Sequence, residues 1–301
     1  MKRKCETGMK RNSLKAWVLA ARPKTLTGAA VPVMIGLSMA WADGGRQLSW
    51  VPAMLCLLFA FVMQIDANLV NDYFDFVRGT DDKETRLGPE RACTQGWVSI
   101  AAMKRAIVLT TCVACLIGLP LVLYGGWKLL LVGVACVVFC FLYTTCFSYI
   151  GLGDVLVLVF FGLVPVVCTY YIQMQTVGSR VLVASLACGL VIDALLLVNN
   201  FRDRDSDRLT GKHTLVVRMG AKAGLYTYLG TGITACLLGT VFIPDGHWPA
   251  FVLPLLYLLL HFKSFCRMKQ IWEGRALNSV LGQTARNIFV YGLLVSIGFL
   301  L

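Results

Sequence analysis

Carboxylate and amide side chains close two of the long apolar runs in this chain. The segments LVNDYFD (69–75) and LVNNFRD (197–203) match one another, so that Asn71 corresponds to Asn199 and Asp75 to Asp203. Residues three, four, seven or eight positions apart share one face of a helix. The spacing therefore predicts two helix faces rich in oxygen ligands. The first face holds Asn68, Asn71, Asp72 and Asp75, and the second holds Asn199, Asn200, Asp203 and Asp207.

Oxygen ligands without neighbouring His or Cys favour Mg²⁺. This ion takes one or two carboxylates and completes its octahedral shell with water and phosphate oxygens. Ionisable residues at membrane depth are functional by default, so we predict catalytic carboxylates around the metal. Two deeper acids, Asp66 and Asp193, fit either a site role or a buried neutral carboxyl. The predicted metal ligands are Asn71, Asp72, Asp75, Asn199, Asp203 and Asp207, and the four Asp residues among them are also predicted to be catalytic.

The segments after both motifs supply bases that suit a diphosphate. Arg binds phosphate through two parallel hydrogen bonds, and Lys binds it as a point charge. Such side chains can also form a solvated rim of weak ion pairs, an alternative that stays open for Lys83. Acids for a metal and bases for an anion, at the mouth of an apolar bundle, predict a site for a lipid diphosphate. The predicted substrate-binding side chains are Asn68, Asn71, Asn199, Asn200, Arg78, Lys83, Arg86, Arg91, Arg202 and Lys212.

The elements that position these residues are membrane helices. The chain is 57% hydrophobic and 15% charged, whereas soluble domains carry about 25% charged residues. Its apolar runs are continuous and long enough, at about 20 residues, to cross a bilayer as helices. The predicted fold is therefore an all-α integral membrane protein with nine transmembrane helices. The predicted spans are 25–42, 51–77, 104–124, 127–147, 152–175, 180–201, 221–243, 248–270 and 279–301.

The positive charge is distributed unevenly between the two sides of these spans. Only Arg46, Lys128 and Arg180, of the 28 Lys and Arg residues, fall on the side that faces away from the acidic motifs. Basic residues collect on the cytoplasmic side of membrane proteins, which predicts a cytoplasmic N-terminus and site and an external C-terminus. The same bias indicates that the positive charge faces the headgroups of the lipid bilayer and does not bind nucleic acid. We expect one polytopic domain over 1–301, with 1–21 as a basic amphipathic tail on the membrane surface.

Several motifs together resemble the UbiA superfamily of membrane prenyltransferases. They are ARPKTLTGAAVPVMIG (21–36), NDYFDFVRGTD, RLGPERACTQGWVS, YTTCFSYIGLGD and NNFRDRDSDRLTGKHTLVVRMG, and they cover nearly the whole chain. The run GPxRxxxxG, the GLGD and the RDxxxDxxxGKxTL resemble more closely the branch that prenylates 1,4-dihydroxy-2-naphthoate. The resemblance implies a nine-helix bundle with a central cavity, a cytosolic cap over both Asp motifs, and a prenyl diphosphate bound through Mg²⁺.

The chain departs from the superfamily pattern at two places. Many members carry a third Asp four residues past the position of Asp75, where this chain has Gly79, with Asp81 just beyond. Other members have a Lys-Arg pair a few residues after the position of Tyr143, and here that pair is missing. The candidates in that loop are therefore Tyr143 and Asp154 as catalytic residues and Tyr149 as a substrate-binding residue.

The branch implies a specific reaction. A polyprenyl group would pass from an all-trans polyprenyl diphosphate to 1,4-dihydroxy-2-naphthoate with loss of CO₂ and diphosphate, giving demethylmenaquinol for menaquinone biosynthesis in the cell inner membrane. Tyr143, Tyr149 and Tyr73 would guard an allylic cation, and Asp154 or a deeper Asp would serve as base. The alternatives are a sibling enzyme for 4-hydroxybenzoate or homogentisate, and a secondary transporter with the acids as its ion site. No spacing indicates the prenyl length.

Overall fold

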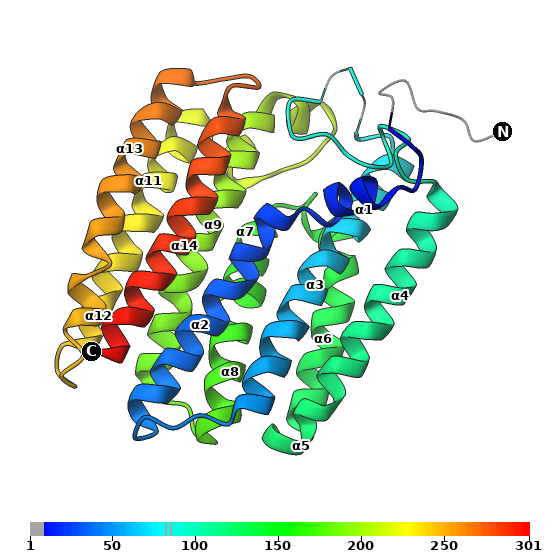
Figure 1. Ribbon diagram of the computed structural model, residues 1–301. Helices are drawn as coiled ribbons and strands as arrows, with labels where there is room; N and C mark the ends of the chain where they lie inside the picture. The colour runs from blue at the N-terminus through cyan, green and yellow to red at the C-terminus, as the bar shows by residue number, and fades with distance from the viewer. Residues whose placement is uncertain (1–8, 82, 85) are drawn as a thin grey trace.

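The computed structural model describes residues 9–301 apart from positions 82 and 85, and over these residues its regular elements are all helices (Figure 1). Nine helical segments among them are long and apolar enough to cross a membrane, which confirms the predicted fold class. The elements are α1 Leu14–Ala21, η1 Pro23–Thr25, α2 Leu26–Asp43, α3 Trp50–Val77, α4 Ile100–Gly118, η2 Leu119–Leu121, α5 Val122–Gly125, α6 Lys128–Leu142, η3 Tyr143–Phe147, α7 Gly153–Val157, η4 Leu158–Leu163, α8 Val164–Met174, α9 Ser179–Leu209, α10 Leu215–Met219, α11 Ala221–Leu238, η5 Gly239–Phe242, α12 Pro249–Val252, α13 Leu255–Ile271 and α14 Leu277–Leu300.

Helix α9 runs eight residues further than the span predicted from hydropathy. The predicted span stops at 201, whereas the helix continues to Leu209 and ends before Gly211, whose φ of +74° suits a helix terminus. The extension has few apolar residues, so a hydropathy pattern cannot detect it. It keeps the whole second acidic motif helical, and this continuity sets the directions of its side chains.

The helices form two groups, with α2, α7 and α8 between them (Figure 1). Helices α9, α11, α13 and α14 lie together on one side, and α3, α4 and α6 lie on the other. Helix α2 packs along α14 and also contacts α3. Close approach depends on small residues, as is common in membrane bundles. A Cβ on Gly162 would lie 2.5 Å from the Ser185 carbonyl oxygen, so only glycine allows η4 to pack this closely on α9.

The N-terminal helix α1 is part of the packed structure at the acidic end. The tail 1–21 was expected to lie on the membrane surface, yet Ala16 and Ala20 of α1 are fully buried. They pack with Val70 of α3 and with Trp97 and Val98 of the connection between α3 and α4. Helix α1 therefore packs against the connection between α3 and α4. We call the segment 78–99 together with α1 the cap.

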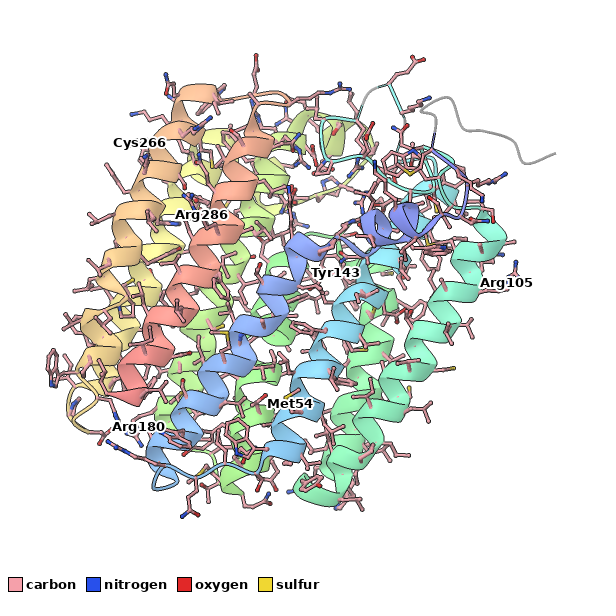
Figure 2. The ribbon with its side chains drawn as sticks, in the orientation of Figure 1. Met54, Arg105, Tyr143, Arg180, Cys266 and Arg286 are labelled. Carbon is pink, nitrogen blue, oxygen red and sulfur yellow. The ribbon has the colours of Figure 1, made fainter. Side chains whose placement is uncertain are left out.

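The wall from α6 to α8 contains two π-helical segments, η3 and η4. Such i→i+5 turns are rare in proteins, and those that occur often lie at functional sites. Segment η3 begins with Tyr143, and Figure 2 places this residue near the centre of the molecule, below the cap. Asp154 lies at the start of α7, between the two π-helical segments.

The end of the bundle opposite the cap is joined by a separate ion-pair cluster. Asp43, the last residue of α2, accepts hydrogen bonds from the Tyr170 hydroxyl (2.7 Å) and from Arg180 (3.0 Å). Arg180 also pairs with Asp245 at 3.1 Å. Figure 2 shows Arg180 at this end, far from the acidic motifs. The cluster connects α2, α8 and α9 and takes no part in the site described next.

Candidate active site

One large cavity of about 1750 Å³ runs into the bundle from beneath the cap. Ligand pockets in proteins are commonly about 300–1,000 Å³, so this cavity exceeds the size needed for a small aromatic molecule. Its cap end is lined by the polar side chains of both motifs, and its depth is mostly apolar. The apolar part includes Phe139, Phe160, Phe161, Val137 and Leu156.

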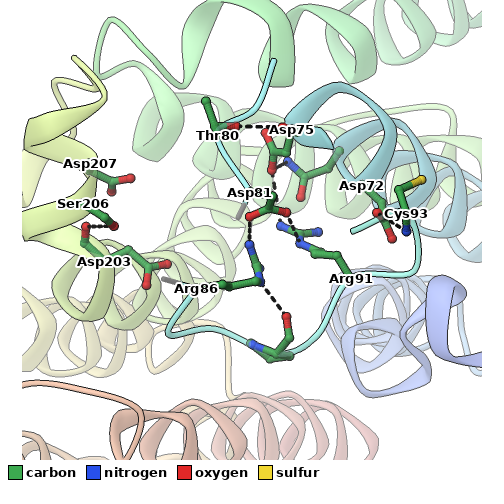
Figure 3. Close-up of polar contacts among 12 residues, drawn as sticks. Asp72, Asp75, Thr80, Asp81, Arg86, Arg91, Cys93, Asp203, Ser206 and Asp207 are labelled. Carbon is green, nitrogen blue, oxygen red and sulfur yellow. Dashed lines mark hydrogen bonds and ion pairs between the residues drawn. The ribbon is translucent and has the colours of Figure 1, made fainter. Parts of the chain in front are cut away.

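The first motif contributes Asn71 and Asp75 to the cavity from the end of α3. The Asn71 side-chain amide donates a hydrogen bond to Asp75 Oδ2 at 3.0 Å, and the Arg91 guanidinium lies 3.4 Å from the same oxygen. Asp75 is only 7% exposed. The structure thus places a shielded carboxylate with one amide and one cation beside it at the cap end (Figure 3).

Asp72 points away from the cavity, contrary to the predicted shared face. Its carboxylate accepts hydrogen bonds from the backbone N–H groups of Ala92 (2.8 Å) and Cys93 (3.1 Å), and it is 1% exposed (Figure 3). Asp72 lies about 100° around the helix from Asn71, at the edge of the predicted stripe, where the cap segment covers it. In this arrangement its oxygens fix the cap and are not directed at a metal. Burial and the Asp72 charge raise the pKa of the Cys93 thiol, which stays neutral.

Asn68 lines the cavity but is already engaged by the N-terminal segment. Its amide nitrogen donates to the Ala21 carbonyl oxygen (3.0 Å) and to the Thr25 hydroxyl (2.9 Å). Gln64 donates to its oxygen at 3.4 Å. Asn68 therefore holds the connection between α1 and α2 against α3, which in turn positions Arg22 at the cavity.

The cap is held together by a small network of charges. Asp81 pairs with both Arg86 and Arg91 (Figure 3). Arg86 and Arg91 also line the cavity. Burial lowers the pKa of Arg86 to about 10, with a contribution from the nearby Arg22, so its guanidinium is still protonated at neutral pH. The cap thus presents two cations to the space between the acidic motifs.

The second motif lines the opposite side of the cavity mouth. Asn199, Asn200, Asp203 and Asp207 of α9 all border it, as predicted from their spacing. Arg202 binds Asp203 through two hydrogen bonds, Nε to Oδ1 at 2.8 Å and Nη2 to Oδ2 at 2.5 Å. Figure 3 shows Asp203 and Asp207 across the gap from Asp75.

Contacts from α14 and the cap immobilise Arg202. Its Nη1 donates to Asn278 Oδ1 at 2.8 Å, and the Asn278 amide donates to the Leu87 carbonyl oxygen, also at 2.8 Å. Gly88 packs directly on the guanidinium, since a Cβ there would lie 2.7 Å from Arg202 Nη2. The cap, α9 and α14 therefore meet at one buried arginine.

Three predicted substrate-binding residues lie outside the cavity lining. Arg78 donates to the Thr144 and Thr145 carbonyl oxygens and lies 5.0 Å from the Tyr149 ring centroid. Tyr149 does not line the cavity, and Lys83 is an exposed residue of the cap. Lys212 does line it, 5.3 Å from the Tyr149 ring centroid and 3.9 Å from Asp207. Arg78 thus supports η3 and packs on Tyr149, which lies in the loop after η3.

Tyr143 and Asp154 line the cavity deeper than the two acidic motifs. The Tyr73 ring, expected as a possible guard, instead packs against Phe74 and lies 5.6 Å from the Lys104 ammonium. Of the two deep acids, Asp66 accepts hydrogen bonds from the Thr110 and Thr111 hydroxyls and ties α3 to α4. Asp193 is buried on α9.

Arg22 is a cavity residue that the sequence interpretation missed. It ends α1 in the left-handed region (φ 51°), lines the cavity, and lies close enough to Asp72 and Asp75 to interact with their charges. Its Nη2 is buried without a hydrogen-bond partner among the described residues. The signal was the ARPK segment at the start of the first span, where a basic residue precedes a proline. Asn278 gave no signal, because its role comes from a contact with the distant cap.

The donor set of this cavity fits a metal-bound diphosphate better than a metal alone. Within the described residues no three Asp, Glu, His or Cys side chains converge on one point. Mg²⁺ commonly uses one or two protein carboxylates and takes other ligands from water and phosphate, so Asp75 on one side and Asp203 with Asp207 on the other suffice. Arg22 Nη2 and Arg91 Nη1 are buried donors without partners in the described chain, as expected of groups that await an anion.

The cavity also opens toward the lipid-facing surface of the bundle. Leu116 on α4 and Val134 on α6 line it and are also 71% and 55% exposed. Because both side chains belong to the lipid-facing surface, the apolar depth of the cavity communicates with the surroundings between α4 and α6. A long isoprenoid chain can therefore extend beyond the protein.

Several known bacterial proteins have sequences related to this chain. The 1,4-dihydroxy-2-naphthoate octaprenyltransferase of Escherichia coli (strain K12) is 40% identical over 215 residues, 68% of this chain and 69% of that protein. The protein of the same description from Haemophilus influenzae is 31% identical over 300 residues, 96% of each chain.

Solved structures share the fold at low sequence identity. A UbiA homolog from Aeropyrum pernix K1, in an apo structure, matches with a TM-score of 0.66 at 13% identity, over 91% of this chain and 96% of its own. A UbiA homolog from Archaeoglobus fulgidus bound to GPP and Mg²⁺ matches with a TM-score of 0.65 at 12% identity, over 93% and 99%. The sequence profile of the UbiA prenyltransferase family matches residues 29–291. The chain belongs to the UbiA prenyltransferase family.

Proposed function

We propose that this protein transfers a polyprenyl group from an all-trans polyprenyl diphosphate to 1,4-dihydroxy-2-naphthoate. CO₂ and diphosphate leave, and demethylmenaquinol forms for menaquinone biosynthesis. The observation that carries the proposal is the pair of acidic helix ends, Asp75 on α3 and Asp203 on α9, which face one cavity with an apolar depth. The names of the bacterial relatives support the choice of acceptor.

The metal would be Mg²⁺, as in the ligand-bound homolog from Archaeoglobus fulgidus. The residues that would hold it are Asn71 and Asp75 from α3 and Asn199, Asp203 and Asp207 from α9. When bound, Mg²⁺ neutralises the diphosphate charge. Asp72 is left out of this set, because its oxygens are bonded to the cap backbone.

The cations around the cavity mouth act on the leaving group. Breaking the allylic C–O bond moves negative charge onto the diphosphate, and donors fixed in advance stabilise charge that develops in the transition state. Arg22, Arg86 and Arg91 approach from the cap side, while Arg202 and Lys212 approach from α9 and the loop that follows it. Arg202 also holds Asp203 in place through its two hydrogen bonds.

The allylic cation needs surroundings that neither react with it nor admit water. Aromatic faces attract a cation by about 0.5–2 kcal/mol each. Tyr143, Phe139 and Phe160 line the cavity below the acids and supply such faces. The isoprenoid tail would follow the apolar wall toward the opening between α4 and α6.

The protein is a multi-pass membrane protein, and we propose the cell inner membrane as its location. The chain would form one polytopic domain. The cap and both acidic motifs would face the cytoplasm, where the basic residues collect, and the C-terminus would lie outside. Figure 1 supports this assignment, since α1 and the C-terminus lie at opposite ends of the bundle.

An assay of the purified protein in lipid tests the proposal. With Mg²⁺, a polyprenyl diphosphate and 1,4-dihydroxy-2-naphthoate labelled in its carboxylate, we expect prenylated quinol and labelled CO₂ in equal amounts. A chelator should stop the reaction, and added Mg²⁺ should restore it. Turnover of 4-hydroxybenzoate or homogentisate instead, without release of CO₂ from the naphthoate, would reassign the acceptor. Absence of prenyl transfer to all three would refute the proposal.

A further inference from the structure

Two carboxyl groups deep in the bundle have no role in the diphosphate site. Asp154 stands at the start of α7 and lines the cavity, and Asp193 lies in the middle of α9, 4% exposed. The Oδ1 atom of each is buried without a hydrogen-bond partner among the described residues. Asp66, the other deep acid, differs because two threonine hydroxyls bond it.

The packing of α7 and η4 on α9 places the two carboxyl groups at the same depth. A Cβ on Gly153 would lie 3.4 Å from Leu196, and a Cβ on Gly189 would lie 3.1 Å from the Leu158 backbone. The segment 153–158 therefore runs antiparallel to residues 189–196 of α9. Asp193 lies within this part of α9 and is level with Asp154. The two groups are close enough for their charges to repel each other.

The cavity is lined by one member of this pair, Asp154, and by Tyr143. A Cβ on Gly153 would lie 3.8 Å from Tyr143 Oη, so the phenol lies beside the start of α7. Asp154 and Tyr143 line the cavity, whereas Asp193 lies behind them. The other acids that interact with Tyr143 are Asp75 and Asp207, toward the cap. Asp193 is ten residues below Asp203 on α9, a rise of about 15 Å.

Elementary electrostatics limits the charge that this pair can carry. A buried carboxylate without a partner is costly, and two adjacent buried carboxylates do not both ionise. Other enzymes with such pairs keep one proton between the two groups. No cation is paired with Asp154 or Asp193 among the described residues, so a proton held between them would remove the cost of a second buried charge.

We propose that Asp154 and Asp193 share one proton and together form the acid–base group for the hydroxyl of the aromatic acceptor. The proposal rests on the function proposed above. Asp154, which lines the cavity, would be the catalytic residue that touches the hydroxyl. Asp193 would be a positioning residue, which holds the shared proton on the far side of Asp154 and sets its charge.

The proton balance of the reaction gives this pair two tasks. When the ring carbon that bears the carboxylate attacks the allylic carbon, the C–O bond to diphosphate breaks and its electrons leave with the diphosphate. The adjacent ring hydroxyl becomes a carbonyl, and its proton passes to Asp154. The bond to the carboxylate then breaks, its electron pair restores the aromatic ring, and CO₂ departs. The ring oxygen takes the proton back from Asp154, so the pair ends in its starting state.

Infrared spectroscopy of the substrate-free protein in lipid tests the shared proton without any turnover. We expect a protonated-carboxyl C=O band that shifts in D₂O. Its frequency should change in both Asp154→Asn and Asp193→Asn, because the buried carboxyl that remains stays neutral but no longer shares its proton. The matched control is Asp66→Asn, which removes another buried carboxyl and should leave this band in place. A band of unchanged frequency in Asp193→Asn, or no such band in the wild type, would overturn the proposal.

Kinetics of the same variants test the use of the proton. General acid–base groups contribute about 10²- to 10⁴-fold, so Asp154→Asn should lower kcat by at least about 100-fold. Asp193→Asn should lower kcat by about 10- to 100-fold, while the Kd for the prenyl diphosphate and the KM for the naphthoate change less than threefold. Wild-type kcat in Asp193→Asn would overturn the proposal. A wild-type protein inactive on the naphthoate would instead overturn the proposed function, and the substrate-free infrared result distinguishes the two failures.

Discussion

The two acidic motifs have similar sequences but are held in different ways. In the first, Asp75 faces the cavity while its neighbour Asp72 is bonded to the cap backbone. In the second, Asn200 occupies the position equivalent to Asp72, and it lines the cavity together with Asp203. Asp75 is approached by Arg91 from the cap, whereas Asp203 is held by the adjacent Arg202 of its own helix.

The difference shows how a repeated helix face can divide its tasks. Because α9 continues to Leu209, Asn199, Asp203 and Asp207 stay on one continuous helix face. Helix α3 ends at Val77, so the chain must turn back over the site, and one acid of the first motif secures that turn. Equivalent positions in the repeat therefore serve chemistry in one copy and structure in the other.

The largest expected effect comes from Asp75 and Asp203, the carboxylates at equivalent positions of the two motifs. Asp75→Asn and Asp203→Asn should each lower prenyl transfer by at least about 10³-fold, equivalent to about 4 kcal/mol, because each side holds part of the metal–diphosphate complex. Radiolabelled prenyl transfer measures the loss, and thermal unfolding checks the fold. Near wild-type activity in either variant would refute the two-sided site.

The next prediction compares the loss of activity when an arginine that lines the cavity is removed with the loss when an arginine outside it is removed. Arg91→Ala should lower kcat by about 100-fold, the range seen when a fixed transition-state donor is removed, and should raise the KM for the prenyl diphosphate. The control is Arg105→Ala on α4, and its activity should stay within twofold. Among the residues that the structure describes, this guanidinium bonds only the Ala101 carbonyl oxygen. Equal losses of activity in the two variants would contradict a specific role of the cap cations in catalysis.

Substitutions at the equivalent positions 72 and 200 should give opposite patterns. Asp72→Ala leaves two buried N–H groups without an acceptor, which costs about 1–3 kcal/mol each, so the melting temperature should fall together with an activity loss of about tenfold. Asn200→Ala should lower activity severalfold with little change in melting temperature. Thermal unfolding and initial rates on both variants decide, and matching profiles would contradict the division of tasks.

The smallest effect tests the contact between cap and second motif. Gly88→Ala places a methyl group 2.7 Å from Arg202 Nη2 and must displace a guanidinium that Asp203 and Asn278 hold. We expect a loss of activity of a few fold, with a higher KM for the prenyl diphosphate. Gly230→Ala is the control, since its Cβ meets no atom within 4 Å and alanine favours a helix by up to about 1 kcal/mol.

Periodicity and hydropathy predicted the parts of the structure that depend on local order. The nine spans are confirmed, and the spacing of Asn71 and Asp75, and of Asn199, Asp203 and Asp207, correctly placed each set along one cavity wall. These positions follow from the helix itself, because 3.6 residues per turn fix which side chains align.

Periodicity and hydropathy could not predict contacts between segments that are distant in the sequence. The direction of Asp72 depends on the backbone of Ala92 and Cys93, twenty residues on, and the place of Arg22 depends on the Asn68 bond that holds the N-terminal segment. Arg78 was predicted to bind substrate because it is basic and follows the motif, whereas it bonds the Thr144 and Thr145 carbonyl oxygens within η3. Spacing along one helix carries no information on such partners.

The opening between α4 and α6 has a consequence for how the reaction is measured. A cavity that communicates with the acyl-chain region draws its lipid substrate from the bilayer, so the relevant concentration is the mole fraction in the membrane and not the amount per litre. Adding inert phospholipid at constant total substrate should therefore slow the enzyme, as in surface dilution. Leu116 and Val134 lie at this opening, and the same route would return the lipid product to the membrane.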